Sequence, residues 1–196
     1  MLTTLLVIIP AYLIGAIPTG VILTRLSGAE DIRKVGSGNI GATNVYRTAG
    51  RKLGILTLVG DVLKGALPVL AISLSGRFSP EVVAMTAVAA FVGHCYPIYL
   101  RFQGGKGIAT ALGIFLVLSP LSVLVAFFVF AGLFMAFKYI SLSSISAAAT
   151  VPFMVVVQGS NPPLIAASLF MAAVMIWRHR SNIDRLIKGE EPKFKS

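Results

Sequence analysis

Long apolar runs separated by short polar connections make up most of this chain of 196 residues. The hydrocarbon core of a bilayer is about 30 Å thick, and a helix needs about 20 apolar residues to cross it. By that length the sequence predicts seven membrane-spanning helices, near residues 2–25, 53–75, 81–100, 107–119, 120–137, 142–158 and 162–178. We therefore expect an all-α integral membrane protein in which residues 1–196 form a single polytopic domain.

The fourth and fifth helices are predicted to be short, because they share one apolar run from Ile108 to Phe137. Ser119-Pro120 in the middle of that run is a turn signal. Because Lys and Arg collect in short cytoplasmic loops, their distribution tests the two interpretations of the run. With two helices, every basic residue outside the spans except Arg77 falls on one side, whereas one long helix divides them evenly. The sequence thus predicts an N-terminus outside the cell and a C-terminus in the cytoplasm.

Composition supports the membrane assignment and narrows the chemistry. Hydrophobic residues make up 56% of the chain and charged residues only 12%, with a mean hydropathy of +0.88, whereas about a quarter of a soluble domain is charged. The first apolar run has no basic residue before it and no small-residue cleavage pattern, so we expect it to remain as a helix. The single cysteine, Cys95, excludes an intramolecular disulfide, and two histidines and seven carboxylates show no ligand-like spacing. We expect no metal, no cofactor, no nucleic acid and no obligate protein partner.

Three polar segments fall on the predicted cytoplasmic side and contain nearly all the groups that could do chemistry. They are the 25–52 loop, the turn at 101–106 with its approach HCYPIYLRFQGGKG, and the tail WRHRSNIDRLIKGEEPKFKS. The opposite connections, such as SGRFS and QGSNPP, are short and poor in reactive groups. The sequence therefore predicts a site that faces the cytoplasm.

Gly36, Gly38 and Gly41 in the first segment have the spacing G-x-G-x-x-G. A dinucleotide site of that pattern needs a strand before the glycines, a helix after them and a βαβ unit around them, and this context is absent. QGGKG likewise lacks the spacing and the Ser or Thr of a P-loop. What remains is the ability of glycine-rich backbone to direct N–H groups toward an anion.

Residues around these glycines, and Lys106 in the second segment, could contribute further donors to an anion-binding site. Neutral donors and basic groups are supplied by Ser37, Asn39, Thr43, Asn44, Arg47 and Lys106. A phosphorylated ligand suits this set, because Arg offers a planar fork and Lys a mobile point charge. The alternative is a flexible basic loop held near anionic lipid head groups.

Ionisable residues elsewhere leave alternatives open. Asp61 and Lys64 stand three apart on one helix face and could form either a wall of the site or a structural ion pair. We expect His94 to be a helix-packing histidine. His179 ends the last span beside basic residues and Asn182, where an imidazole could transfer a proton near neutral pH or contact lipid phosphate.

The segments GSGNIGATNVYR, FQGGKGIAT and WRHRSNIDRLIKGEE closely resemble the three motifs of a bacterial membrane glycerol-3-phosphate acyltransferase, the PlsY family. The resemblance extends to the length, the number of spans and the basic cytoplasmic side. It implies transfer of a fatty acyl group from acyl phosphate to the 1-hydroxyl of glycerol 3-phosphate. The products would be lysophosphatidic acid and phosphate, in the first step of phospholipid synthesis. The protein would be a multi-pass component of the bacterial cytoplasmic (inner) membrane.

The resemblance also implies roles for individual residues. The substrate-binding positions are Ser37, Asn39, Asn44 and Arg47, then Lys106 with the backbone of Gly104, Gly105 and Gly107, then His179 and Asn182, with Glu191 holding the tail. The loop chemistry adds Gly36, Gly38, Gly41 and Thr43 to this set. The catalytic candidates are Ser37, Lys106, His179 and Asn182. The expected partners are acyl phosphate, glycerol 3-phosphate and membrane lipid.

An acyl phosphate is already activated, so the enzyme's expected task is positioning and charge stabilisation. We expect direct attack by the hydroxyl, with either His179 or the departing phosphate accepting the proton. An acylated Ser37 is less favoured, because no base and orienting partner can be identified for it. The alternative functions are a transporter of organophosphates and a lipid-binding scaffold. The acyl chain length, the oligomeric state and the order of substrate binding are left open.

Overall fold

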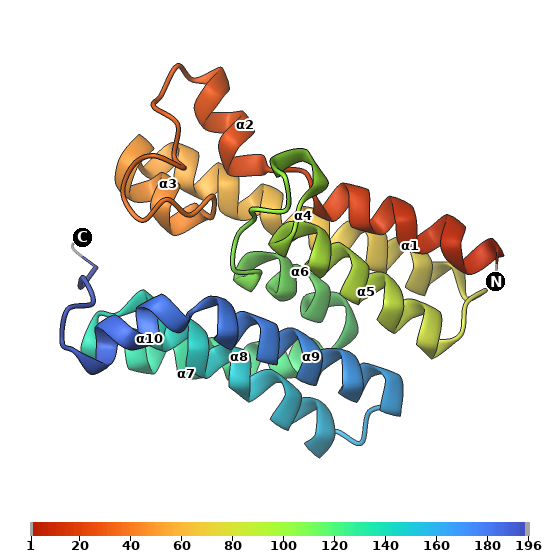
Figure 1. The fold of residues 1–196 in the computed structure, drawn as a ribbon. Coiled ribbons are helices and arrows are strands. Elements are labelled where there is room, and N and C mark those ends of the chain that lie inside the picture. The colour runs from red at the N-terminus through yellow and green to blue at the C-terminus, as the bar shows by residue number, and fades with distance from the viewer. Residues whose placement is uncertain (1, 195–196) are drawn as a thin grey trace. The chain divides into compact units, whose positions relative to one another are not determined.

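The computed structural model describes residues 2–194, and every regular element in that range is a helix (Figure 1). The helices are α1 (Leu2–Gly15), α2 (Thr19–Leu26), α3 (Ala42–Ala49), α4 (Arg51–Ser75), α5 (Pro80–Cys95), η1 (Ile98–Leu100), α6 (Ile108–Leu118), α7 (Pro120–Phe137), α8 (Ile140–Val157), α9 (Pro162–Arg178) and α10 (Arg180–Ile187). The chain packs as two compact units, Met1–Val117 and Leu118–Ser196. The predicted all-α class is confirmed for the described residues.

Within residues 2–194, four helical segments are long and apolar enough to cross a membrane by themselves. They are Arg51–Ser75, Pro80–Leu100, Pro120–Phe137 and Ile140–Val157. Two bent pairs, α1 with α2 at 42° and α9 with α10 at 56°, raise the number to six if each pair is one span. Helix α6 is apolar but shorter. The seven-span count and the orientation of the termini therefore stay predictions.

Helices α1, α4 and α5 pack against one another in the first unit (Figure 1). Small residues allow α1 and α5 to approach closely. A Cβ on Gly15 would overlap the backbone of Ala90, and one on Gly93 would overlap the backbone of Tyr12. Such contacts are typical of helices in lipid, where dispersion and small side chains replace the hydrophobic effect.

The first predicted span, 2–25, is not one continuous helix. Helix α1 ends at Gly15 and α2 begins at Thr19, because Pro18 lacks the N–H that would continue the hydrogen-bond ladder. The carbonyl of Ile17 accepts hydrogen bonds from Thr19 N at 3.0 Å and from Lys64 Nζ at 2.7 Å. The break thus directs α2 away from the axis of α1 and into the first polar segment.

The first polar segment is more ordered than the flexible loop considered above. Residues Ala42–Ala49 form α3, which packs against α4, where Gly54 lies against the backbone of Tyr46. Ile32, Ile40 and Val45 form a small buried cluster of their own. The glycine-rich loop is therefore built around a hydrophobic core.

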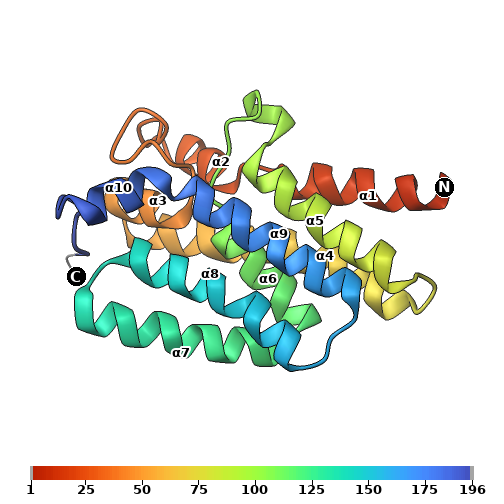
Figure 2. The same cartoon turned by 60° about the horizontal axis from the view of Figure 1, so that its bottom comes forward.

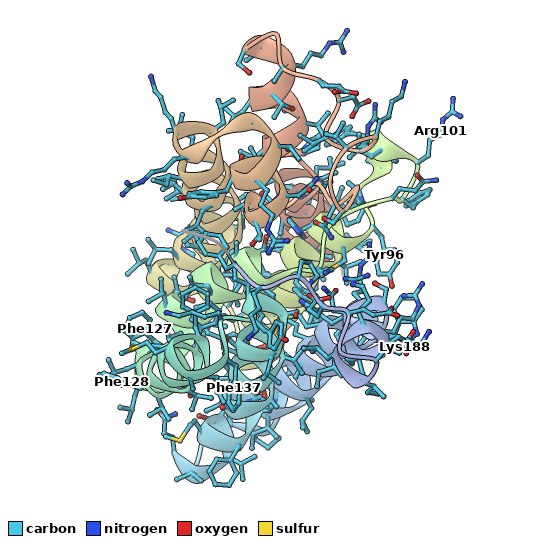
Figure 3. All side chains as sticks on the ribbon, turned by 90° about the vertical axis from the view of Figure 1, so that its left-hand side faces the viewer. Tyr96, Arg101, Phe127, Phe128, Phe137 and Lys188 are labelled. Carbon is cyan, nitrogen blue, oxygen red and sulfur yellow. The ribbon has the colours of Figure 1, made fainter. Side chains whose placement is uncertain are left out.

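The second unit contains α7 to α10, and α8 packs against each of the other three (Figure 2). Helix α6 ends at Leu118 and α7 begins at Pro120, which confirms the predicted turn. Side chains of Phe127 and Phe128 on α7 are 60% and 65% exposed and point outward (Figure 3). An apolar outer face of this kind is typical of a helix in contact with lipid.

Candidate active site

Asn44 organises the glycine-rich loop from beneath. It is buried on α3, with 3% of its surface exposed. Its Oδ1 accepts a hydrogen bond from Ser37 N at 2.9 Å, and its Nδ2 donates to Ile32 O at 3.0 Å and Val35 O at 3.2 Å. Gly36 lies so close that a Cβ there would overlap the Asn44 side chain. Asn44, predicted to bind substrate, is thus a brace for the loop in this structure.

Several loop amides are already used within the loop. Ser37 N is bonded to Asn44, Gly38 N donates to Val35 O at 3.0 Å, and Gly41 N donates to Asn39 Oδ1 at 2.8 Å. A nest of these N–H groups around an anion would require the bonds to break. The loop's other donors include the exposed Ser37 hydroxyl and the amide nitrogen of Asn39.

Helix α3 continues the loop directly and brings Thr43 and Arg47 one turn apart on the same helix face. Gly41 is its N-cap, and no side chain caps it. The first N–H groups of a helix lack intrahelical partners and attract anions. The arginine fork is exposed, and no ion pair to it is present among the described residues. The N-terminus of α3 thus offers N–H groups, and Arg47 in its last turn offers an exposed guanidinium; both kinds of donor suit a phosphate.

Arg33, in contrast, is paired within the same segment. Its Nη2 lies 2.6 Å from Asp31 Oδ2, and its backbone N–H also donates to Asp31. The side-chain hydrogen bond from Arg33 lowers the pKa of Asp31 to about 2. This carboxylate remains charged through the physiological range and offsets one of the basic charges of the loop.

The second motif is a tight turn seated on α5. Gly105 N donates to His94 O at 3.1 Å, and a Cβ on Gly104 would overlap that same carbonyl. A Cβ on Gly105 would overlap the His94 ring, and one on Gly107, at φ +87°, would overlap the Phe91 ring. These glycines are therefore required by packing, whatever they bind. Arg101, earlier in this loop, extends away from the protein (Figure 3).

Lys106 lies between two buried glycines of this turn and is itself half-buried. Leu100, within the approach to the turn, packs against the Ile32, Ile40 and Val45 cluster of the first motif. The first unit thus brings the first two motifs into one packed region.

The third motif belongs to the second unit, at the junction of α9 and α10. His179 is both C-cap of α9 and N-cap of α10, and only 4% of its surface is exposed. Its Nδ1 lies 2.7 Å from Met175 O. Because a carbonyl only accepts, Nδ1 carries the hydrogen, and Nε2 of the neutral ring bears the lone pair. That tautomer suits a proton acceptor.

Glu191 connects the tail to the third motif. Its Oε1 accepts from Asn182 Nδ2 at 2.7 Å, and its Oε2 accepts from Arg185 Nε at 2.7 Å. Burial alone would raise the pKa of Glu191, but the Ser141 hydroxyl beside it and these two hydrogen bonds hold that pKa below its usual value. The amide nitrogen of Asn182 is therefore oriented by a carboxylate. Glu191 has the tail-holding position that the resemblance implied.

The pairing of Asp61 and Lys64 is confirmed, with Nζ and Oδ1 2.7 Å apart. Sequence reasoning missed the contact of His94 with the second motif, because no spacing rule relates it to residues ten positions later. His94 Nδ1 also lies 3.7 Å from Asp61 Oδ1. Within the described residues, no group of three or more His, Cys, Asp or Glu could hold a metal ion.

The chain is similar to known proteins over almost its whole length. A family model described as glycerol-3-phosphate acyltransferase matches residues 5–189. A Syntrophotalea carbinolica protein named glycerol-3-phosphate acyltransferase is 61% identical over 192 residues, covering 97% of each chain. A Geobacter sulfurreducens protein of the same name is 53% identical over all of both chains.

A solved structure extends the similarity to three dimensions. It is the crystal structure of PlsY (YgiH), an integral membrane glycerol 3-phosphate acyltransferase, in its glycerol 3-phosphate form. The TM-score is 0.93 at 41% sequence identity, covering 98% of this chain and 96% of that one. A second structure of PlsY, in its lysophosphatidic acid form, has a TM-score of 0.90 at 39% identity. This chain is therefore a multi-pass integral membrane protein, and it belongs to the glycerol-3-phosphate acyltransferase family.

Proposed function

We propose that this protein transfers a fatty acyl group from acyl phosphate to the 1-hydroxyl of glycerol 3-phosphate. The products are lysophosphatidic acid and inorganic phosphate, in the first step of phospholipid synthesis. The observation that carries the proposal is the family match over residues 5–189, which includes the first two motifs and the third as far as Gly189. The basic groups of the motifs suit it, because both substrates carry phosphate and the acyl chain needs an apolar neighbourhood.

The proposed binding roles follow the chemistry of each segment. Lys106 and the two glycine-rich turns hold the acyl phosphate, where the ammonium offsets the charge of the departing phosphate. Arg47, with the fork that suits phosphate geometry, holds glycerol 3-phosphate together with His179 and Asn182. Ser37, Asn39 and Thr43 supply neutral hydrogen bonds. The tight packing around Gly105 and Asn44 supports these roles by fixing the backbone that presents the neighbouring side chains.

In the proposed reaction, the substrate hydroxyl attacks the carbonyl carbon of the mixed anhydride. A new C–O ester bond forms, the C–O bond to phosphate breaks, and phosphate leaves with the bonding pair. His179 Nε2 or the departing phosphate accepts the hydroxyl proton. We favour direct transfer over an acylated Ser37, because the residues that hold the Ser37 backbone provide no side-chain base.

For the membrane topology we propose seven spans, with the N-terminus outside and all three motifs on the cytoplasmic side of the bacterial inner membrane. The support is the distribution of Lys and Arg, of which only Arg77 lies in an outer connection. Both bent pairs suit this arrangement, because their shorter helices, α2 and α10, carry the basic residues Arg25 and Arg185. A cysteine introduced in the 76–79 turn should react with an impermeant thiol reagent in intact cells.

One assay tests the proposed function. Purified protein is given glycerol 3-phosphate with acyl phosphate or, in parallel, with acyl-CoA, and lysophosphatidic acid is measured. We expect product from acyl phosphate only. If product forms with acyl-CoA and not with acyl phosphate, acyl phosphate is refuted as the donor. If no product forms with either donor, the proposed activity is refuted. An acyl group trapped on Ser37 in a quenched reaction would refute direct attack.

A further inference from the structure

Three buried ionisable side chains, Asp61, Lys64 and His94, meet inside the first unit. Their exposed fractions are 2%, 6% and 3%. Asp61 Oδ1 lies 2.7 Å from Lys64 Nζ and 3.7 Å from His94 Nδ1, so one carboxylate oxygen faces both partners. Charges inside a membrane protein are costly and usually have a defined task. The roles assigned above do not use these three residues.

The cluster is tied to the backbone at two places. Lys64 Nζ donates to Ile17 O at the break between α1 and α2. His94 carries the second motif, since its carbonyl accepts from Gly105 N and its ring fills the space that a Cβ on Gly105 would need. Asp61 on α4 lies between these two attachments.

The same region of α4 also contacts the helix that follows the second motif. A Cβ on Gly65 would overlap the carbonyl of Thr110 in the first turn of α6. Contacts thus fix the chain on both sides of Lys106: His94 contacts Gly105, which precedes it in sequence, and α4 contacts α6, which follows it. A shift of the His94 ring would move the backbone of Gly105, which is bonded covalently to Lys106.

We infer that Asp61, Lys64 and His94 are positioning residues that act through Lys106. The inference rests on the proposed function, in which Lys106 holds the phosphate of the acyl donor. The carboxylate fixes the His94 ring, the ring and carbonyl of His94 fix the turn, and the turn sets where the ammonium lies. A displacement of about 1 Å at a reacting group can reduce the rate a hundredfold.

The test is a kinetic comparison of folded variants. Asp61→Leu with Lys64→Met removes both charges at similar volume, which avoids leaving one charge buried without its partner. His94→Leu removes the ring under Gly105 and keeps the Asp61–Lys64 pair. Thr86→Val is the control, because Thr86 is a buried polar residue on the same helix as His94, and its hydroxyl donates to Val82 O, one turn earlier in that helix, at 2.7 Å.

We expect KM for the acyl donor to rise roughly tenfold to a hundredfold in both test variants, about the effect of losing one hydrogen bond to a charged group. KM for glycerol 3-phosphate and the thermal midpoint should stay near those of the control. If the double variant does not fold, the His94→Leu enzyme decides the outcome.

Two results would overturn the inference. One is a folded His94→Leu enzyme whose KM for the acyl donor matches that of the control. The other is an equal fall in kcat with both KM values unchanged, which would mean a smaller folded fraction and a purely structural role. Both leave the proposed function intact, whereas a parent enzyme that forms no lysophosphatidic acid would remove both proposals.

Discussion

Replacing Asn44 by alanine should destabilise the conformation of the glycine-rich loop without unfolding the protein. The side chain makes three hydrogen bonds to loop backbone, at 2.9, 3.0 and 3.2 Å. If each hydrogen bond contributes a net stabilisation of about 1 kcal/mol, the loop conformation loses about 3 kcal/mol of stabilisation in this variant. Exposed loops open at free energies well below that of global unfolding, so a loss of this size makes the braced form a minority. We expect kcat/KM for glycerol 3-phosphate to fall by up to about a hundredfold.

Hydrogen exchange distinguishes this brace from a direct substrate contact. In Asn44→Ala without substrate, the amide of Ser37 should exchange much faster, because its acceptor has been removed. Thr48→Ala is the matched control, since Thr48 lies one turn later on α3 and its hydroxyl makes one bond to a helix carbonyl. The reasoning fails if Asn44→Ala loses activity while its loop amides exchange as slowly as those of the control.

Further predictions concern the other motifs. Gly36→Ala should reduce activity far more than Gly28→Ala, because both glycines have positive φ but only the first would overlap a neighbouring side chain; kinetics at equal folded protein checks this. Lys106→Ala should abolish turnover with the thermal midpoint unchanged, and a fully active variant would count heavily against the proposed site. Glu191→Gln should lower kcat/KM, whereas Glu190→Gln, at an exposed position, should not. Because the folded pKa of Glu191 lies below the ordinary value of 4.5, its contribution to stability is present above that pH and is lost as the pH falls through the folded pKa. The thermal midpoint of the parent should therefore approach that of Glu191→Gln at acidic pH, and a constant difference between them down to about pH 3 would contradict the assignment.

The sequence locates the long apolar helices, because runs of apolar residues mark them, whereas the count of seven spans stays a prediction. It also locates the Ser119-Pro120 turn and the Asp61–Lys64 pair, since both depend on residues close together in the chain. The break at Pro18 was missed because the surrounding residues are apolar enough for one span, and the Lys64 contact that satisfies Ile17 O is 47 residues distant.

The positions of the motifs could be identified from the sequence, but the hydrogen-bond partners of their backbone amides could not. Glycine-rich spacing predicts N–H groups available to an anion, yet Gly38 and Gly105 each donate to a protein carbonyl. The acceptors are Val35 and His94, and nothing in a G-x-G pattern specifies them. Asn44 likewise has an amide side chain of the kind that binds ligands, but in the structure this side chain donates to the loop backbone.

A loop that satisfies its own amides and has its own apolar cluster pays little conformational entropy when a phosphate arrives. Ile32, Ile40 and Val45 bury the inside of the loop, and the Asn44 side chain bonds to its backbone. Binding therefore does not have to fold the segment, and the interaction energy of the side chains goes into affinity and orientation. If the first motif binds phosphate as proposed, it does so with a preorganised backbone, which suits an enzyme whose main task is to position two anionic groups.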